Sequence, residues 1–257
     1  NANSVYIAGF TITSGSLNTS AVRVFSSSNT ISNCNILNSG TGIYFDSSSY
    51  NIISNCNVSW NNWQGIFFYK SSNNTVINCV VIGNRCDGIE AEFLSDFNNI
   101  VECVLSLNGG DGFGVHMCSY DIVSNSNFLN NSVGISDSSH VAIAYCNMSG
   151  CGVVISYSSE CILTSNQIQN TKEGLHVIGN QKQHYNQSID TSTTVNGKPV
   201  YYYYNLSDAL IEDLDAGHIT LAYCVNVFLR NITISDGDPL YIFCLLYTSD
   251  AADEEDS

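Results

Sequence analysis

The sequence predicts an all-β solenoid in which short strands wind into stacked coils. Three observations support this fold class. A pattern of Cys and apolar residues recurs about every 22 residues, the apolar residues within each copy alternate, and Asn, Ser and Gly fill the gaps between the runs. Fixed periods of this size are typical of repeat architectures, in which each unit buries its inner face only against its neighbours.

The repeat is clearest in a column of cysteines with an apolar residue three positions before each and another two positions after. Its members are Cys34, Cys56, Cys79 and Cys103. A Gly-apolar pair follows each of them, at Gly42, Gly65, Gly88 and Gly112. Further copies continue to Gly174, and a late one surrounds Leu229. We therefore expect nine or ten coils, which at about 4.8 Å per coil form a rod of about 45 Å.

Each copy should form strands rather than helices. The runs 42–45 and 65–68 alternate, and β-branched and aromatic residues fill them. A leucine-rich repeat has a similar period, but it requires Leu at several fixed places in each copy, and Leu is sparse here.

Two columns of equivalent residues are expected to be structural. Ser126 and Asn166 take the place of Cys in the cysteine column, which favours a slot for small buried side chains. Disulfides between coils and a metal array are the alternatives, although no C-x-x-C motif occurs. The second column should stack its amides at a turn, and it contains Asn61, Asn84, Asn108 and Asn131.

The period divides the chain into four parts. Residues 1–178 are expected to form the coils, 179–218 an insertion packed on them, and 219–240 a terminal coil. Within the insertion, Asp208–Asp215 should form a short helical turn or a loop. Residues 244–257 do not continue the pattern, and 244–254 resemble a translated sequencing adapter, so we interpret this tail as non-native.

The pattern Ile-x-Asn-Cys-x-Ile-x-x-Asn, followed by Gly-Ile, resembles the NosD-like repeat, also called the carbohydrate-binding and sugar-hydrolase repeat. The resemblance covers about 3–178 and 219–235. It implies a right-handed parallel β-helix of the pectin-lyase-like type, on a secreted or surface-attached prokaryotic protein. It specifies fold more than activity, because one fold hosts many functions.

Charge excludes several classes of partner. The formal net charge is −16, with 7 Lys and Arg against 23 Asp and Glu, which argues against nucleic acid.

No apolar run approaches the roughly 18 residues of a membrane span. The name of the resembling family suggests copper handling, but the 2 Met and 5 His form no soft-ligand cluster.

The outer face carries one concentration of ionisable residues. If the residues one and three positions after each repeat Gly point inward, those one before, two after and four after point outward. This counting predicts that five side chains converge on two neighbouring coils: Asp87, Glu90, Glu92, Asp111 and His116. Paired carboxylates can perform acid/base chemistry or hold Ca²⁺, and a solvated acidic face is the simpler interpretation.

Aromatic residues flank this acidic group and suggest a sugar-binding surface. They are Tyr44, Phe67 and Tyr69 on the same face, with Trp60 and Trp63 at a nearby turn. Each Trp is as consistent with packing over a coil edge as with stacking on a sugar ring.

The sequence therefore favours a non-catalytic module that acts as a spacer or binds glycans or cell-envelope components, without a cofactor. An extracellular, cell-surface or periplasmic location fits this function. The alternative is a polysaccharide lyase, epimerase or hydrolase, although the catalytic motifs of polygalacturonases and the Asp-Pro-His of alginate epimerases are absent. Copper or calcium handling is a third, weaker alternative.

Overall fold

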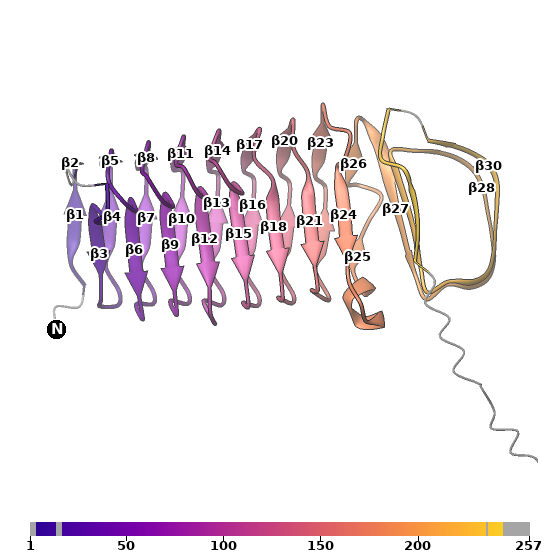
Figure 1. Ribbon diagram of the computed structural model, residues 1–257, viewed down its shortest axis with the longest axis horizontal. Helices are drawn as coiled ribbons and strands as arrows, with labels where there is room; N and C mark the ends of the chain where they lie inside the picture. Colours follow the sequence, from indigo (N-terminus) through magenta and orange to yellow (C-terminus); the bar gives the residue numbers. More distant parts are fainter. Residues whose placement is uncertain (1–3, 14–16, 235, 244–257) are drawn as a thin grey trace, which may run out of the picture.

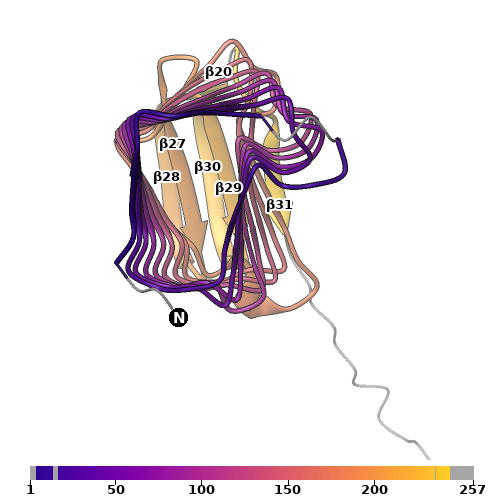
Figure 2. The same cartoon turned by 90° about the vertical axis from the view of Figure 1, so that its left-hand side faces the viewer.

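The computed structural model forms a rod of stacked coils (Figure 1). It describes residues 4–13, 17–234 and 236–243, so the tail interpreted as non-native lies outside the described residues. The view along the rod shows successive coils superposed on one another (Figure 2). Equivalent strands pair in parallel, for example Ile53 of one coil with Val76 of the next, which confirms the predicted parallel β-helix.

Three parallel sheets form the walls of the rod. Sheet A contains β1 (Tyr6–Ala8), β4 (Thr30–Ser32), β7 (Ile52–Ser54), β10 (Thr75–Ile77), β13 (Asn99–Val101), β16 (Ile122–Ser124), β19 (Ala142–Ala144), β22 (Ile162–Thr164) and β25 (Ser188–Ile189). Sheet C contains β3 (Val22–Val24), β6 (Ile43–Asp46), β9 (Ile66–Tyr69), β12 (Ile89–Glu92), β15 (Phe113–His116), β18 (Val133–Ser136), β21 (Val153–Ser156) and β24 (Leu175–Ile178).

Sheet B extends further along the rod than the other two. Its coil strands are β2 (Thr11–Ile12), β5 (Asn35–Leu37), β8 (Asn57–Ser59), β11 (Val80–Ile82), β14 (Val104–Ser106), β17 (Asn127–Leu129), β20 (Asn147–Ser149), β23 (Gln167–Gln169) and β26 (Thr194–Val195). It continues into β27 (Lys198–Tyr204), β29 (His218–Ala222) and β31 (Leu240–Phe243).

The cysteine column lies in the core, as predicted. Cys34, Cys56, Cys79 and Cys103 are each at most 2% exposed, and Ser126 and Asn166 occupy equivalent buried places. Every Cys in the described part of the chain is a free thiol. The slot therefore selects small side chains that fill the interior between the sheets.

Two ladders of buried amides run along the rod. In the predicted one, Asn61 Nδ2 donates to Asn84 Oδ1 at 2.8 Å, and the pattern continues through Asn108 to Asn131. The other ladder runs through Asn29, Asn51, Asn74 and Asn98 and ends at Asp121. Each amide satisfies backbone groups at a turn that the strand ladders leave unpaired.

The segment expected as an insertion has strands of its own. Its first part contains a 3₁₀ helix, η1 (Lys182–Tyr185), but β25 and β26 then pair with β22 and β23 and so continue the coils. A hairpin turn follows, because β27 runs antiparallel to β26. The expected short helical turn or loop at Asp208–Asp215 is wrong, since these residues lie within β28 (Ser207–Ala216).

The C-terminal strands form a unit at the end of the rod. β28 pairs in parallel with β30 (Val225–Ile234), and Figure 1 shows this pair beyond β27. Asp238 joins the unit to the coils: it is fully buried, accepts a hydrogen bond from the Leu175 N–H at 2.8 Å, and lies 2.8 Å from His218 Nδ1.

Candidate functional site

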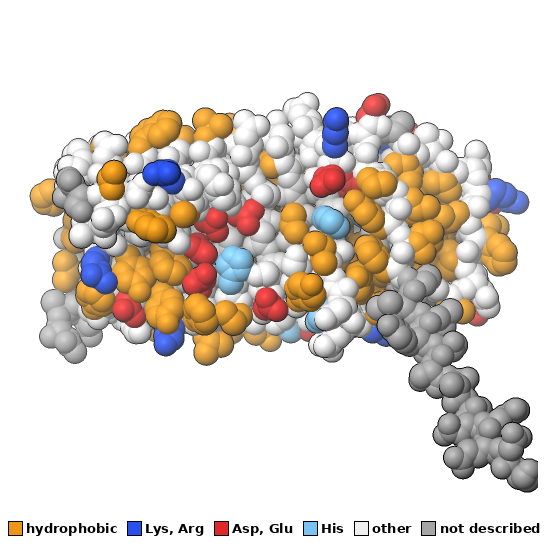
Figure 3. Space-filling view, viewed as in Figure 1, with side chains coloured by type: hydrophobic (Ala, Val, Ile, Leu, Met, Phe, Trp, Pro, Cys, Tyr) orange, Lys and Arg blue, Asp and Glu red, His pale blue; other side chains and the backbone are white. Residues whose placement is uncertain are grey.

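The outer face of sheet C carries the predicted site. The first and third residues after each repeat Gly point into the core, as Ile89 and Ala91 do, and the residues between and after them point outward. Figure 3 shows this face, on which acidic and histidine side chains gather beside an apolar area nearer the N-terminal end.

Three of the five predicted ionisable residues converge closely. Asp87 precedes β12, Glu90 lies on β12 and His116 on β15, and one ligand atom from each lies within 4.8 Å of the other two. Glu90 Oε1 is 3.9 Å from His116 Nε2. Glu90 is only 8% exposed although it points outward, and its other oxygen accepts a 2.6 Å hydrogen bond from Gln64 Nε2.

The other two predicted residues surround this group. Asp111 donates a backbone hydrogen bond of 2.9 Å to Asp87 Oδ1, while its own carboxylate accepts from Ser132 Oγ at 2.5 Å. Glu92 is paired in register with His116 on the neighbouring strand. Both carboxylates add negative charge beside Asp87 and Glu90.

Burial and like charges perturb the two central carboxyl groups. Burial, and after it the neighbouring Asp111 charge, raise the pKa of Asp87 to about 6. Burial likewise raises the pKa of Glu90 to about 8, with the Asp87 charge as the next cause. Uncompensated negative charge is unfavourable at this site, so both carboxyl groups retain a proton to a higher pH than an exposed carboxyl group.

Glycines make room for these side chains. A Cβ on Gly110 would lie 1.9 Å from Asp87 Oδ1, and one on Gly114 would lie 2.3 Å from Asp87 Oδ2. Position 114 is the outward site on β15 opposite Glu90. Any side chain there would displace Asp87, so Gly114 forms the floor of the cluster.

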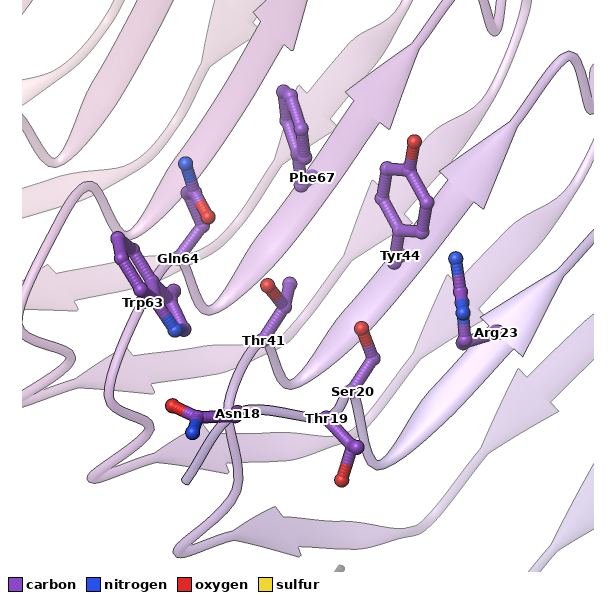
Figure 4. A pocket seen from close by; sticks show the side chains of 9 residues that line it. All are labelled: Asn18, Thr19, Ser20, Arg23, Thr41, Tyr44, Trp63, Gln64 and Phe67. Carbon is purple, nitrogen blue, oxygen red and sulfur yellow. The ribbon is translucent and has the colours of Figure 1, made fainter. Parts of the chain in front are cut away.

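Figure 4 shows a cavity of about 310 Å³ with aromatic residues in its lining. It lies beside the cluster, because its lining residue Gln64 donates to Glu90. Its rings come from Tyr44, Trp63 and Phe67, and Tyr44 and Phe67 stack with ring centroids 5.4 Å apart. The guanidinium of Arg23 lies 5.4 Å from the Tyr44 ring centroid, and Gln64 lines the cavity near Trp63. Tyr69 contacts Phe67 at 6.2 Å between centroids and so extends the aromatic surface.

The two tryptophans have different surroundings. Trp63 is half-exposed and lines the cavity. Trp60 does not line it; its ring covers the backbone of Gly83 in the next coil, where a Cβ would lie 2.6 Å from Trp60 Cε3. The structure thus separates two residues that the sequence treated as equivalent.

A second cavity continues the same face toward the C-terminal end. It measures about 540 Å³, and its lining includes Gly110, Ser132, Lys172 and His176. Gln64 connects the first cavity to Glu90, while Gly110 and Ser132 border Asp87 and Asp111. The acidic cluster therefore lies between two cavities along one face.

The sequence predicted the charged and aromatic residues of the site. It did not predict four residues that contact them: Gln64, Arg23, Gly114 and Ser136, whose hydroxyl group is hydrogen-bonded to His116. Gln64 stood in the column one residue before the repeat Gly, and that position could have identified it as a neighbour of Glu90. The sequence does not distinguish Gly114 as a site residue, because Gly is also common at the turns of the repeat.

The chain belongs to the right-handed β-helix family, because the sequence model described as "Right handed beta helix region" matches residues 1–144. The right-handedness that the family resemblance implied is thereby confirmed. No curated protein matches the sequence.

Solved structures share the fold at low identity. An alginate lyase from Paenibacillus sp. str. FPU-7 is 11% identical with a TM-score of 0.61, and the match covers 91% of this chain and 80% of that one. The catalytic domain of a GH87 α-1,3-glucanase is 13% identical with a TM-score of 0.48, over 95% and 62% of the two chains. The A-module of an Azotobacter vinelandii mannuronan C-5 epimerase is 11% identical with a TM-score of 0.47, over 84% and 63%.

At these identities the likeness shows the fold alone, and it agrees with the predicted pectin-lyase-like type. Within the described ranges, no helix has the length and apolarity needed to cross a membrane.

Proposed function

We propose that the protein is a glycan-binding β-helix that holds a linear, neutral carbohydrate along the outer face of sheet C. The observation that carries this proposal is the row formed by the aromatic cavity, the acidic cluster and the second cavity. It extends from Arg23 on β3 to His176 on β24, seven coil spacings or about 34 Å. A site of this length suits an extended chain better than a compact ligand.

The lining supports a sugar ligand. Tyr44, Phe67 and Trp63 offer flat apolar surfaces against which the C–H faces of sugar rings can pack, while Gln64, Thr41 and Ser20 offer hydrogen bonds to hydroxyl groups. The acidic cluster disfavours an anionic chain, because a uronate carboxylate would meet Asp87, Glu90 and their neighbours. The proposed ligand therefore differs in charge from alginate, which the Paenibacillus lyase is named for.

An extracellular or envelope location and the NosD-like assignment are part of this proposal. Both rest on the repeat pattern and on the kind of ligand that the surface fits.

Binding to a panel of neutral linear hexasaccharides, with an oligogalacturonate as the anionic comparison, tests the proposal. We expect binding of at least one neutral chain and weaker binding of the anionic one. Trp63→Ala and Phe67→Ala should each weaken binding about tenfold, which corresponds to about 1.4 kcal/mol. Trp60→Ala is the matched control and should bind like the wild type, because its ring lies outside the cavity. Absence of binding across the panel, or an equal loss for Trp60→Ala and Trp63→Ala, would contradict the proposal.

Enzymatic turnover is the second candidate function. One observation favours it: the acidic cluster lies between the two cavities, where a bound chain would pass over it. The bound neutral hexasaccharide is incubated with the protein and assayed for new reducing ends. Release that disappears in His116→Gln would support an enzyme, whereas an unchanged hexasaccharide would leave binding as the function.

A further inference from the structure

Each of the three converging side chains makes a hydrogen bond through the polar atom that does not face the other two. The pairs are Asp111 N–H to Asp87 Oδ1 at 2.9 Å, Gln64 Nε2 to Glu90 Oε2 at 2.6 Å, and Ser136 Oγ with His116 Nδ1. Each of these bonds engages one polar atom and leaves the other atom of the same group facing the centre. Supporting hydrogen bonds of this kind orient metal ligands in proteins.

The two inward-facing carboxylate oxygens have few contacts that would compensate their charge; His116 Nε2 is 3.9 Å from Glu90 Oε1. No N–H or hydroxyl group in the described ranges donates to Asp87 Oδ2 or to Glu90 Oε1. Nor does a described Lys or Arg form an ion pair with either carboxylate. The Glu90 side chain is only 11% exposed, so solvent compensates its charge poorly. The space at Gly114 keeps Asp87 Oδ2 and His116 Nε2 open to one another, 2.3 and 3.7 Å from the position that a Cβ would occupy.

We propose that Asp87, Glu90 and His116 bind a divalent transition-metal ion of the Zn²⁺ type, through one oxygen of each carboxylate and through His116 Nε2. A tetrahedral Zn²⁺ about 2.1 Å from each ligand places the ligand atoms about 3.4 Å apart. The 3.9 Å between Glu90 Oε1 and His116 Nε2 is close to this separation, and rotation of the side chains can supply the difference.

The ligand set distinguishes this ion from Ca²⁺. Imidazole nitrogen is a ligand for Zn²⁺ and its neighbours in the first transition row, whereas Ca²⁺ takes six to eight oxygen ligands. Three protein ligands are the usual number where a fourth position stays open for water or another oxygen donor. That position would lie on the outer face of sheet C, because Glu90 and His116 project from this face and Asp87 lies just before β12.

Titration calorimetry with Zn²⁺, on the tag-free 257-residue chain stripped with a chelator, tests the proposal. We expect one equivalent of Zn²⁺ per chain. Glu90→Gln and His116→Gln should each weaken affinity at least tenfold, and Asp46→Asn, a carboxylate two coils away on the same face, should leave it unchanged. Gly114→Ala retains every ligand but places a methyl group against Asp87, and it should also weaken affinity at least tenfold. Thermal melting of each variant verifies that it is folded.

Co²⁺ provides a second readout, since its visible absorption reports nitrogen and oxygen ligation and should change in His116→Gln. The proposal is overturned if the wild type binds no Zn²⁺, or if folded Glu90→Gln and His116→Gln bind it as the wild type does. Equal affinity for Ca²⁺ with the same dependence on Glu90 would overturn the assignment to a transition metal. Glycan binding is tested separately, because its test residues Trp63 and Phe67 lie outside the metal site, and the comparison of neutral with anionic chains is made on metal-free protein.

Discussion

Asp121→Asn should stabilise the protein. Asp121 is fully buried at the end of the ladder formed by Asn29, Asn51, Asn74 and Asn98. Its Oδ1 accepts a 2.7 Å hydrogen bond from the Asn98 N–H, but its Oδ2 has no partner. In Asn74 and Asn98 the atom that corresponds to Asp121 Oδ2 is Nδ2. Each Nδ2 donates a hydrogen bond to the backbone carbonyl three residues earlier in the chain. An Asn at 121 could donate in the same way to the Cys118 carbonyl.

The expected gain follows from removing one unsatisfied buried group. Such a group costs about 1–3 kcal/mol. Taking about 2 kcal/mol, the melting temperature should rise by about 4–8 °C for a chain of this size. The matched control is Asp137→Asn, which removes the same charge from an exposed residue and should change the melting temperature much less.

The effect should depend on pH with a definite sign. Burial raises the pKa of Asp121 well above its ordinary value of 3.8. A carboxyl group with a raised pKa in the folded state favours folding when protonated, and this contribution is lost as pH rises above 3.8 toward the folded pKa. The advantage of Asp121→Asn should therefore be small at pH 4 and larger at pH 7. Thermal melts at both pH values measure it, and a variant that is less stable at pH 7, or gains more at pH 4, would refute the reasoning.

Two further predictions concern the C-terminal unit and the thiols. Asp238→Ala leaves His218 and the Gly174 and Leu175 N–H groups without their buried acceptor, at a cost of about 3–5 kcal/mol. Hydrogen exchange should then accelerate in β29 and β31 while β7 and β10 stay protected; unchanged exchange in β29 would contradict this. Iodoacetamide should modify Cys86 in the native protein well before Cys118, Cys146 and Cys161, because burial raises the pKa of these three thiols to about 12, 11 and 12. Peptide mapping over time measures the order, and labelling of Cys118 as fast as Cys86 would show that the core opens readily.

The repeat made most of the fold predictable. Residues about 22 positions apart become neighbours in a solenoid, so the placement of Cys34 beside Cys56, or Asn61 beside Asn84, follows from counting along the chain. The same counting brought Glu90 next to Gly114 and Glu92 next to His116. Counting along the repeat gave a wrong prediction where the period ends. Residues 208–215 are rich in Asp, which favours turns. They nevertheless form a strand, because β30 provides a parallel partner.

The sequence by itself determined the fold class, the inward and outward faces of the strands, and the coils on which the candidate site lies, because all three depend on periods of 2 and about 22 residues. Only the tertiary structure decided how the side chains on those coils meet. It placed Gln64 against the buried Glu90, separated Trp63 from Trp60, and brought one ligand atom from each of Asp87, Glu90 and His116 together beside Gly114. These features depend on rotamers and on the space that a missing Cβ leaves, and no repeat pattern encodes them.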